Sequence, residues 1–354
     1  MSDIPRQLIL FGSPGTGKSR HIAKEILPKI GIEGEENPED SPHATRVVFH
    51  PEYAYGDFMG KLMPLSEDGQ VKYNFYPGHF MQALARAYRN ILEAGSVHDA
   101  QNVALVIEEI NRGNSAAIFG TAFQLLDRSP DDRPDGWSEY PVQLSEMEYD
   151  QLEETLGVVP RTEGDDLIGY KYQGKDYNLE DFYGQLEISA ERKVRIPPNL
   201  YLLATMNTSN ESIYHMDVAF KRRWYWQYMD IEEGIVSEEK EEAAFTGRSE
   251  WENFVDSLND FIRENQKYVR RVEDKQIGHW FLVGEGEEEQ AEFQKSDIQN
   301  KVMFFLWDSV FATSKKPLAD LLDVDESDLV TFGSFTDKVD DFIDAVENHE
   351  WSTE

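Results

Sequence analysis

A glycine-rich segment near the start of the chain has the composition of a phosphate-binding loop. Two glycines separated by four residues are followed by a lysine and a hydroxyl residue, in the run Gly12, Ser13, Pro14, Gly15, Thr16, Gly17, Lys18, Ser19. Glycines allow successive backbone N–H groups to point at a phosphate. We expect Lys18 to reach the β- and γ-phosphates of a nucleoside triphosphate, and the Ser19 hydroxyl to bind Mg²⁺.

The residues on either side of this segment support the same interpretation. Residues 8–11 form a short apolar run typical of a buried strand, and Ile22 and Ile26 have helical spacing. A phosphate-binding loop lies between a strand and a helix, and the helix N-terminus adds partial positive charge. The alternative is a glycine-rich strand–helix turn without a ligand, which these flanks disfavour.

Two acids follow the most apolar predicted strand. The run 103–107 is typical of a central parallel strand, and Glu108 and Glu109 come directly after it. Beside a phosphate-binding loop, the first acid is expected to complete the Mg²⁺ shell and the second to polarise the attacking water. The usual first acid is aspartate, so the longer Glu108 could bind the metal through water or in a shifted geometry. Alternatively, both are solvated acids at the end of a strand.

Polar residues also follow a later predicted strand and a short predicted helix. Asn207 could hold the same water from the side opposite Glu109, or could belong to an ordinary strand–helix turn. Arg222 and Arg223 follow a short helix predicted at 217–220. They could complement the helix dipole or supply an arginine finger to the site of a neighbouring subunit. The sequence does not rank the two arginines.

The charge of the chain restricts its partners. The 354 residues include 68 acidic and 34 basic residues, which gives a formal net charge of −34. This excess opposes binding of DNA by the general surface, so DNA is expected to be contacted through a partner rather than directly. The absence of cysteine excludes disulfides and agrees with a cytoplasmic location. No apolar run predicts a membrane span, and no signal peptide is expected.

Strands alternate with helices over the first two thirds of the chain. This pattern predicts an α/β fold with a parallel, doubly wound sheet in a domain covering residues 1–231. The strands are expected at 8–11, 45–49, 103–107, 200–205 and 224–228, and helices at 19–26, 78–94 and, capped by Asn114, 115–126.

Two regions depart from this alternation. Residues 129–193 are polar and rich in tyrosine, and they are interpreted as an insertion with a hairpin at 170–177. From residue 232 the sequence becomes acidic and then helical in pattern, which predicts a smaller helical lid domain over 232–354. Its helices are expected at 250–268, 297–312 and 336–348.

Five segments, in order, resemble the AAA+ class of P-loop NTPases, and within it the McrB motor subunits of modified-cytosine restriction systems. Residues 107–114 (IEEINRGN) resemble that family's Asp-Glu-Ile-Asn-Arg-Ala-Asn, and residues 206–212 (MNTSNES) its Met-Asn-Thr-Ala-Asp-Arg-Ser. Similar matches occur at 49–58 (FHPEYAYGDF), 217–224 (DVAFKRRW) and 276–281 (QIGHWF). The resemblance covers about residues 7–312, without the 129–193 insertion.

The resemblance implies a homo-oligomeric ring, expected to be a hexamer, that hydrolyses ATP or GTP with Mg²⁺. It also implies a McrC-like nuclease partner. His279 would lie in the helical lid near the nucleotide, unless it belongs only to a capped turn. The sequence departs from the family at Glu108, at Asn210 in place of aspartate and at Glu211 in place of arginine. Because the phosphate-binding loop begins at Gly12, the family's N-terminal DNA-reading module is expected to be lacking.

Three functions remain open from the sequence. The first is the motor NTPase of a DNA-restriction or anti-phage complex. The second is a MoxR-like AAA+ ATPase that remodels a protein partner. The third is a nucleotide-dependent scaffold with weak hydrolysis, which the departures at Glu108, Asn210 and Glu211 would favour.

Overall fold

The chain forms two compact units, Met1–Tyr225 and Trp226–Glu354. The computed structural model describes residues 4–34, 40–67, 70–128, 136–208, 214, 216, 218–230, 242–282, 284 and 290–348. Among these residues, no helix combines the length and the apolar character that crossing a bilayer requires.

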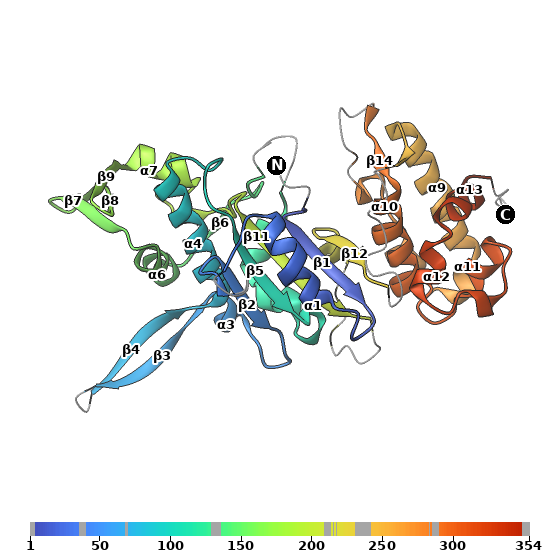
Figure 1. Cartoon of the computed structure of the whole chain (residues 1–354), viewed down its shortest axis with the longest axis horizontal. Helices are drawn as coiled ribbons and strands as arrows, with labels where there is room; N and C mark the ends of the chain where they lie inside the picture. Colours follow the sequence, from blue (N-terminus) through green and yellow to red (C-terminus); the bar gives the residue numbers. More distant parts are fainter. Residues whose placement is uncertain are drawn as a thin grey trace. The chain divides into compact units, whose positions relative to one another are not determined.

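A five-stranded sheet forms the centre of the first unit (Figure 1). Its spatial order is β12-β1-β11-β5-β2, and the pairs β1–β11, β11–β5 and β5–β2 are parallel. The strands are β1 (Gln7–Gly12), β2 (Ala44–Val48), β5 (Val103–Glu108), β11 (Leu200–Asn207) and β12 (Tyr225–Tyr228). The predicted α/β fold with a parallel sheet is therefore confirmed.

The strand order brings the ends of three strands together. β11 lies between β1 and β5, so that Gly12 is opposite Asn207 and Ala204 is opposite Ile107. In open α/β sheets, ligands bind outside the carboxyl ends of the strands, where the strand order reverses. The strand order reverses at β1. From β1 the chain crosses to β2 at one edge of the sheet and then passes through β5 and β11, which lies beside β1. Its last strand in this sheet is β12, on the other side of β1.

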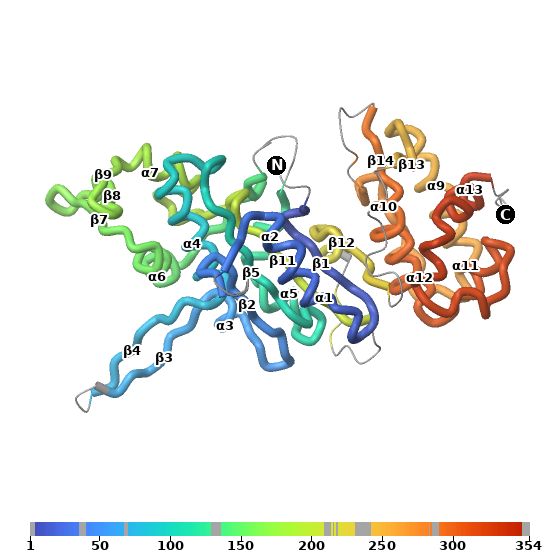
Figure 2. Tube along the Cα trace, in the orientation of Figure 1, coloured from blue at the N-terminus to red at the C-terminus, as the bar shows by residue number. Residues whose placement is uncertain are grey.

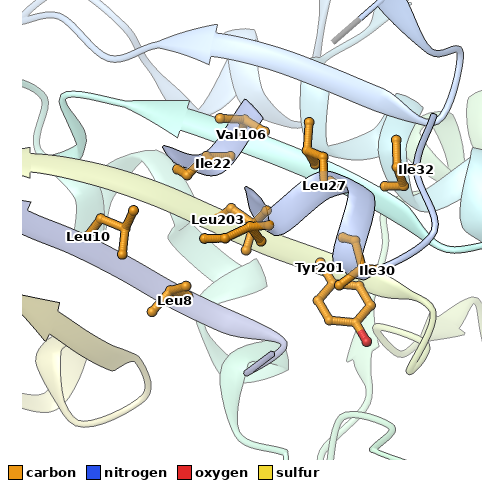
Figure 3. Packing of buried hydrophobic residues seen from close by; sticks show 11 residues of the cluster. Leu8, Leu10, Ile22, Leu27, Ile30, Ile32, Val106, Tyr201 and Leu203 are labelled. Atoms are coloured by element: carbon orange, nitrogen blue, oxygen red, sulfur yellow. The ribbon is translucent and has the colours of Figure 1, made fainter. Parts of the chain in front are cut away.

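A helical run directly after β1 covers one face of this sheet. It comprises α1 (Lys18–His21), a π-helical turn at Ile22–Ile26 and α2 (Leu27–Lys29). Its apolar side chains pack on alternate residues of three strands (Figure 3). The cluster consists of Leu8, Leu10, Ile22, Ile26, Leu27, Ile30, Ile32, Ala104, Val106, Tyr201 and Leu203. This packing fixes the direction in which the chain leaves β1 and enters α1.

Truncating the centre of this cluster should destabilise the first unit. Leu203 is fully buried, so Leu203→Ala leaves a cavity and is expected to reduce the free energy of unfolding by about 2–5 kcal/mol. Chemical denaturation followed by tryptophan fluorescence would measure the change. Val48→Ala, on a side chain that is 52% exposed, is the control and should stay within about 0.5 kcal/mol of the unsubstituted protein.

The other face of the sheet is also covered. Leu105 and Ile107, which alternate with the residues that meet the helical run, are fully buried. Helix α4 (His79–Ala94) packs against β2, β5 and β11. It ends at Gly95, whose φ of 80° is the left-handed conformation common after helices.

The helix predicted at 115–126 is divided. Asn114 caps it as predicted, since the Ala117 N–H donates to the Asn114 side chain at 3.2 Å. However, α5 (Ser115–Phe119) stops at Gly120, and a 3-10 helix continues over Gly120–Leu126. Gly120 has a φ of 50°, and a Cβ there would lie 2.7 Å from the Tyr55 ring. The left-handed φ of Gly120 ends the regular helix, and the nearby Tyr55 ring leaves no room for a side chain at this position.

The predicted insertion is closed at its base by a short antiparallel pair, β6 (Val142–Gln143) with β10 (Lys193–Val194). Between them lie two helices and a three-stranded sheet of order β7-β8-β9. These are α6 (Glu146–Leu156), β7 (Val159–Glu163), β8 (Asp166–Tyr172), β9 (Lys175–Asn178) and α7 (Leu179–Leu186). The hairpin predicted at 170–177 is confirmed, with Tyr172 opposite Lys175.

Sequence reasoning missed a second hairpin, which extends away from the sheet (Figure 2). It consists of β3 (Gly60–Glu67) and β4 (Gln70–Pro77), between α3 (Tyr55–Phe58) and α4. Large apolar side chains on both strands are exposed, including Val71 at 63% and Tyr73 at 68%. β3 lacks an alternation of apolar and polar residues, but in β4 Val71, Tyr73 and Phe75 alternate with Lys72 and Asn74, so a signal for this strand was available in the sequence.

The described residues of the second unit are mainly helical, and β13 (Ala243–Phe245) pairs with β14 (Phe293–Gln294). Stacked aromatic side chains form its core, such as Trp251 on Phe293 with ring centroids 5.2 Å apart. Helices occupy all three predicted regions. They are α9 (Arg248–Glu264), α10 (Lys295–Asp297), π-helical turns at Ile298–Met303 and Leu306–Val310, α11 (Lys316–Leu321), α12 (Phe332–Thr336) and α13 (Val339–Asn348). In the first unit, α8 spans Val218–Lys221.

Candidate nucleotide-binding site

The glycine-rich segment forms the turn between β1 and α1. Gly15 and Gly17 have φ angles of 84° and 88°, a left-handed backbone conformation that residues other than glycine rarely adopt. A Cβ added at either glycine would meet no atom within 4 Å, so the loop has open space beside both. The Thr16 hydroxyl donates to the Ser13 carbonyl at 3.0 Å and closes the turn.

Lys18 is the first residue of α1, and its ammonium group lies inside the loop. Its Nζ donates to the carbonyl oxygens of Gly12 at 3.1 Å and Ser13 at 2.7 Å. Burial lowers the pKa of Lys18 below its ordinary value, while the carboxylates of Glu109 and Glu108 act in the opposite direction. These two carboxylates therefore lie close enough to Lys18 for all three groups to belong to one site.

Glu108, the last residue of β5, contacts the loop helix directly. Its Oε2 accepts hydrogen bonds from the Ser19 hydroxyl at 2.7 Å and from the Thr205 hydroxyl at 2.5 Å. Its Oε1 lies 3.6 Å from the guanidinium group of Arg46 on β2. Thus the two residues predicted to serve a metal ion, Ser19 and Glu108, are brought together.

Glu109 and Asn207 form a second pair at the same edge of the sheet. The Asn207 side-chain amide donates to Oε1 of Glu109 at 2.5 Å. Glu109 adopts φ 55° and ψ 46°, which is left-handed and uncommon for a residue with a side chain. Such conformations cluster at functional sites, where the surrounding structure holds them.

The site fits a magnesium ion by its donor atoms. Oε1 of Glu108 is buried and accepts no hydrogen bond from the described residues, its charged neighbour being the Arg46 guanidinium at 3.6 Å, and Oε2 of the same carboxylate contacts the Ser19 hydroxyl. In the described part of the chain, no three histidine or acidic side chains cluster as a metal site of their own. Mg²⁺ in phosphate-transferring sites usually takes one or two protein oxygens, with phosphates and water supplying the others.

Two known proteins are similar in sequence to this chain. The chain is 28% identical over 368 residues to the Type II restriction enzyme BsuMI component YdiS of Bacillus subtilis, across 96% of this chain and 87% of that protein. It is 24% identical over 281 residues to the EcoKMcrB subunit of the Type IV methyl-directed restriction enzyme of Escherichia coli. The chain is therefore similar in sequence to a restriction enzyme component and to a McrB subunit.

The two similarities cover different shares of the relatives' lengths. The similarity to the Escherichia coli subunit covers 79% of this chain but 47% of that protein, so the chain spans about half of its length. No protein-family model matches the chain. The two relatives are named as parts of different types of restriction enzyme, Type II and Type IV.

The structure separates the two arginines that sequence reasoning left unranked. Arg223 pairs with Asp127 at 2.6 Å, donates to the Ala219 carbonyl at 2.8 Å and lies over the Phe123 ring. The Arg222 side chain, one residue earlier, is exposed. The Arg223 side chain is therefore held by residues of its own chain, and an arginine finger at the exposed Arg222 stays a prediction.

His279 belongs to the second unit, in a turn at the start of a short 3-10 segment. Its Nε2 lies 3.1 Å from Asp256 and its Nδ1 lies 3.9 Å from Glu252, both on α9. Its carbonyl oxygen accepts a hydrogen bond from the Trp251 indole at 2.7 Å. These contacts describe a side chain held by its own unit, and the role in nucleotide binding implied by resemblance stays a prediction. Asn210 and Glu211 lie outside the described residues.

Two residues at the site were missed by sequence reasoning. Thr205 contacts Glu108, and Arg46 lies beside it, although neither belongs to a recognisable motif. A signal for Thr205 was available, because Thr205 and Asn207 are two residues apart on one strand and must share a face of the sheet. Arg46 lies on the edge strand, and its proximity to Glu108 follows only from the register of β2 with β5.

Proposed function

We propose that this chain is a Mg²⁺-dependent nucleoside triphosphatase that hydrolyses ATP or GTP. The observation that carries the proposal is the meeting of Lys18, Ser19, Glu108, Glu109 and Asn207 at one edge of the sheet. A lysine in a glycine-rich loop, a hydroxyl–carboxylate pair and a second carboxylate held by an amide are the groups that phosphoryl transfer to water requires.

Each group has a definite role in this proposal. Lys18 and the loop N–H groups bind and orient the phosphates, while Ser19 and Glu108 hold Mg²⁺. The ion, when bound, neutralises charge that develops on the phosphate oxygens. Glu109 orients the attacking water and draws on its proton, and Asn207 fixes the direction of the Glu109 carboxylate through their 2.5 Å hydrogen bond.

We propose further that the chain acts in a ring, expected to be hexameric, in which Arg222 completes the site of the neighbouring subunit. An arginine finger is planar and always charged, and it stabilises charge on the transferred phosphoryl group. The exposure of Arg222 supports this assignment. The ion pair of Arg223 with Asp127 holds the segment from which Arg222 extends.

Arg222→Ala is expected to reduce turnover by about a thousandfold, the lower end of the effect of an arginine finger, with little loss of nucleotide affinity. Mixing Arg222→Ala with Lys18→Ala subunits should restore part of the activity, because the second variant still offers Arg222 to an intact loop in the first. Arg161→Ala, on the insertion, is the matched control. If Arg222→Ala turns over at the unsubstituted rate, or if mixing restores nothing, Arg222 does not act between subunits.

We propose that the ring drives a McrC-like nuclease subunit in DNA restriction. The names of the two relatives support a restriction complex over remodelling of another protein. Acidic residues outnumber basic ones by 68 to 34, and non-specific DNA binding needs several lysines or arginines that displace counterions from phosphates. DNA is therefore contacted through the nuclease partner, with this chain supplying the nucleotide cycle.

A hydrolysis assay tests the proposal most directly. Phosphate release is measured from ATP and from GTP, with Mg²⁺ and with a chelator, while mass photometry reports the size of the assembly in each condition. Mg²⁺-dependent release from at least one nucleotide is expected. A protein that binds neither nucleotide, or that releases phosphate equally well in chelator, contradicts the proposed function.

A further inference from the structure

We infer that Thr205 is a positioning residue that couples the two acids of the site. The inference rests on the proposed function and extends it to a residue outside the recognised motifs. Thr205 is in β11, two residues before Asn207, and its side chain is 4% exposed. Because β11 pairs with both β1 and β5, the Thr205 hydroxyl lies between the strand that carries the loop and the strand that carries the acids.

The Thr205 hydroxyl uses both its donor and its acceptor capacity at this place. It donates to Oε2 of Glu108 at 2.5 Å and accepts from the backbone N–H of Glu109 at 3.2 Å. A hydroxyl has one proton and two lone pairs, so a single group can serve both acids at once. The same Oε2 also accepts from Ser19, which joins Thr205 to the loop helix through one carboxylate oxygen.

The first consequence concerns Glu108. With Oε2 held by two hydroxyl groups, the carboxylate is fixed in one orientation and its Oε1 accepts no hydrogen bond from the described residues. Glutamate has one more rotatable bond than the aspartate expected at this position, and thus more ways to misplace its carboxylate. The hydrogen bond from Thr205 restricts that freedom, so Glu108 can present its carboxylate to a metal ion as the shorter aspartate would.

The second consequence concerns Glu109. Its left-handed backbone conformation is costly for a residue with a side chain, and the hydrogen bond from its N–H to Thr205 stabilises that conformation. The backbone conformation determines where the Glu109 carboxylate points, and the carboxylate then meets Asn207. β11 therefore holds Glu109 at both ends, through Thr205 on the backbone and Asn207 on the side chain.

The test compares Thr205→Val with Thr205→Ser. Valine keeps the shape and the strand preference but removes the hydroxyl, whereas serine keeps the hydroxyl and removes a methyl group. Outer-shell partners of metal and catalytic groups affect activity by about ten- to a hundredfold. We expect Thr205→Val to lower kcat by that amount with KM little changed, and Thr205→Ser to retain most of the activity. Thr45→Val, on another strand of the same sheet, is the control.

A second measurement does not depend on hydrolysis. Hydrogen exchange followed by mass spectrometry on peptides covering Glu109 should show the amide exchanging about two- to tenfold faster in Thr205→Val, the range expected for loss of one hydrogen bond. Thr205→Ser should protect the amide as the unsubstituted protein does. This measurement remains decisive if the unsubstituted protein hydrolyses no nucleotide, a result that would refute the proposed function alone.

Two results would overturn the inference. Unchanged kcat and unchanged exchange at Glu109 in Thr205→Val would show that the hydroxyl positions neither acid. Impaired Thr205→Ser together with normal activity of Thr205→Val would show that packing of the methyl group, and not the hydroxyl, is what the site requires.

Discussion

Glu109→Gln should retain nucleotide binding but reduce the rate of hydrolysis by about a hundredfold or more, the scale on which a positioned base contributes. Glutamine has nearly the same size as glutamate, and it can still accept a hydrogen bond from Asn207 through its amide oxygen. It cannot draw on the proton of the attacking water. Phosphate release under saturating nucleotide measures the rate, and a fluorescent nucleotide analogue measures binding.

The matched control for this substitution is Glu146→Gln. Glu146 is the first residue of α6, and its side chain is 75% exposed. Glu146→Gln removes one negative charge, as Glu109→Gln does, but leaves the nucleotide site unchanged. The rate of hydrolysis should therefore stay at that of the unsubstituted protein. Normal hydrolysis by Glu109→Gln would show that this acid is not the base, and would leave Glu108 as the acid to examine.

Lys18→Ala should abolish detectable nucleotide binding. The variant removes the ammonium group that the loop encloses, and hydrogen bonds from a charged group to phosphate are about twice as strong as neutral ones. Titration with the fluorescent analogue, and thermal stabilisation of the protein by nucleotide, would both report the loss. Because bound ligand raises the unfolding temperature by mass action, the unsubstituted protein should be stabilised and the variant should not.

Lys24→Ala, which lies on the exposed side of the same helical run, is the control for charge and helix stability. It should bind nucleotide as the unsubstituted protein does. Retained, Mg²⁺-dependent binding by Lys18→Ala would mean that the loop N–H groups alone hold the phosphates, and the role assigned to Lys18 would be wrong.

The parts of the site that were predictable are encoded locally. The strand before the loop, the loop and the following helix are adjacent in sequence; the strand is a short apolar run, the loop is rich in glycine and the helix has helical apolar spacing. The acids at 108 and 109 were predictable for the same reason, since they end an apolar strand. The parallel sheet followed from the alternation of strands and helices.

The features of the site and fold that could not be predicted from the sequence depend on contacts between residues that are far apart along the chain. The ion pair of Arg223 is made with Asp127, which nothing in the local pattern connects with it. The contact of Thr205 with Glu108 requires the register of β11 with β5. The lack of room for a side chain at Gly120 depends on the position of the Tyr55 ring. In each case the decisive neighbour is more than sixty positions away in the sequence.

The position of β11 between β1 and β5 has a consequence for biosynthesis. The loop and the two acids emerge from the ribosome early, but they are never direct neighbours in the sheet, because Gln7 pairs with Leu202 and Val103 pairs with Leu200. Synthesis proceeds from the N-terminus, so the insertion must be translated before the strand that joins the two halves of the site exists. A nascent chain that ends before Asn207 carries every acid and glycine of the site and still has no place for a nucleotide.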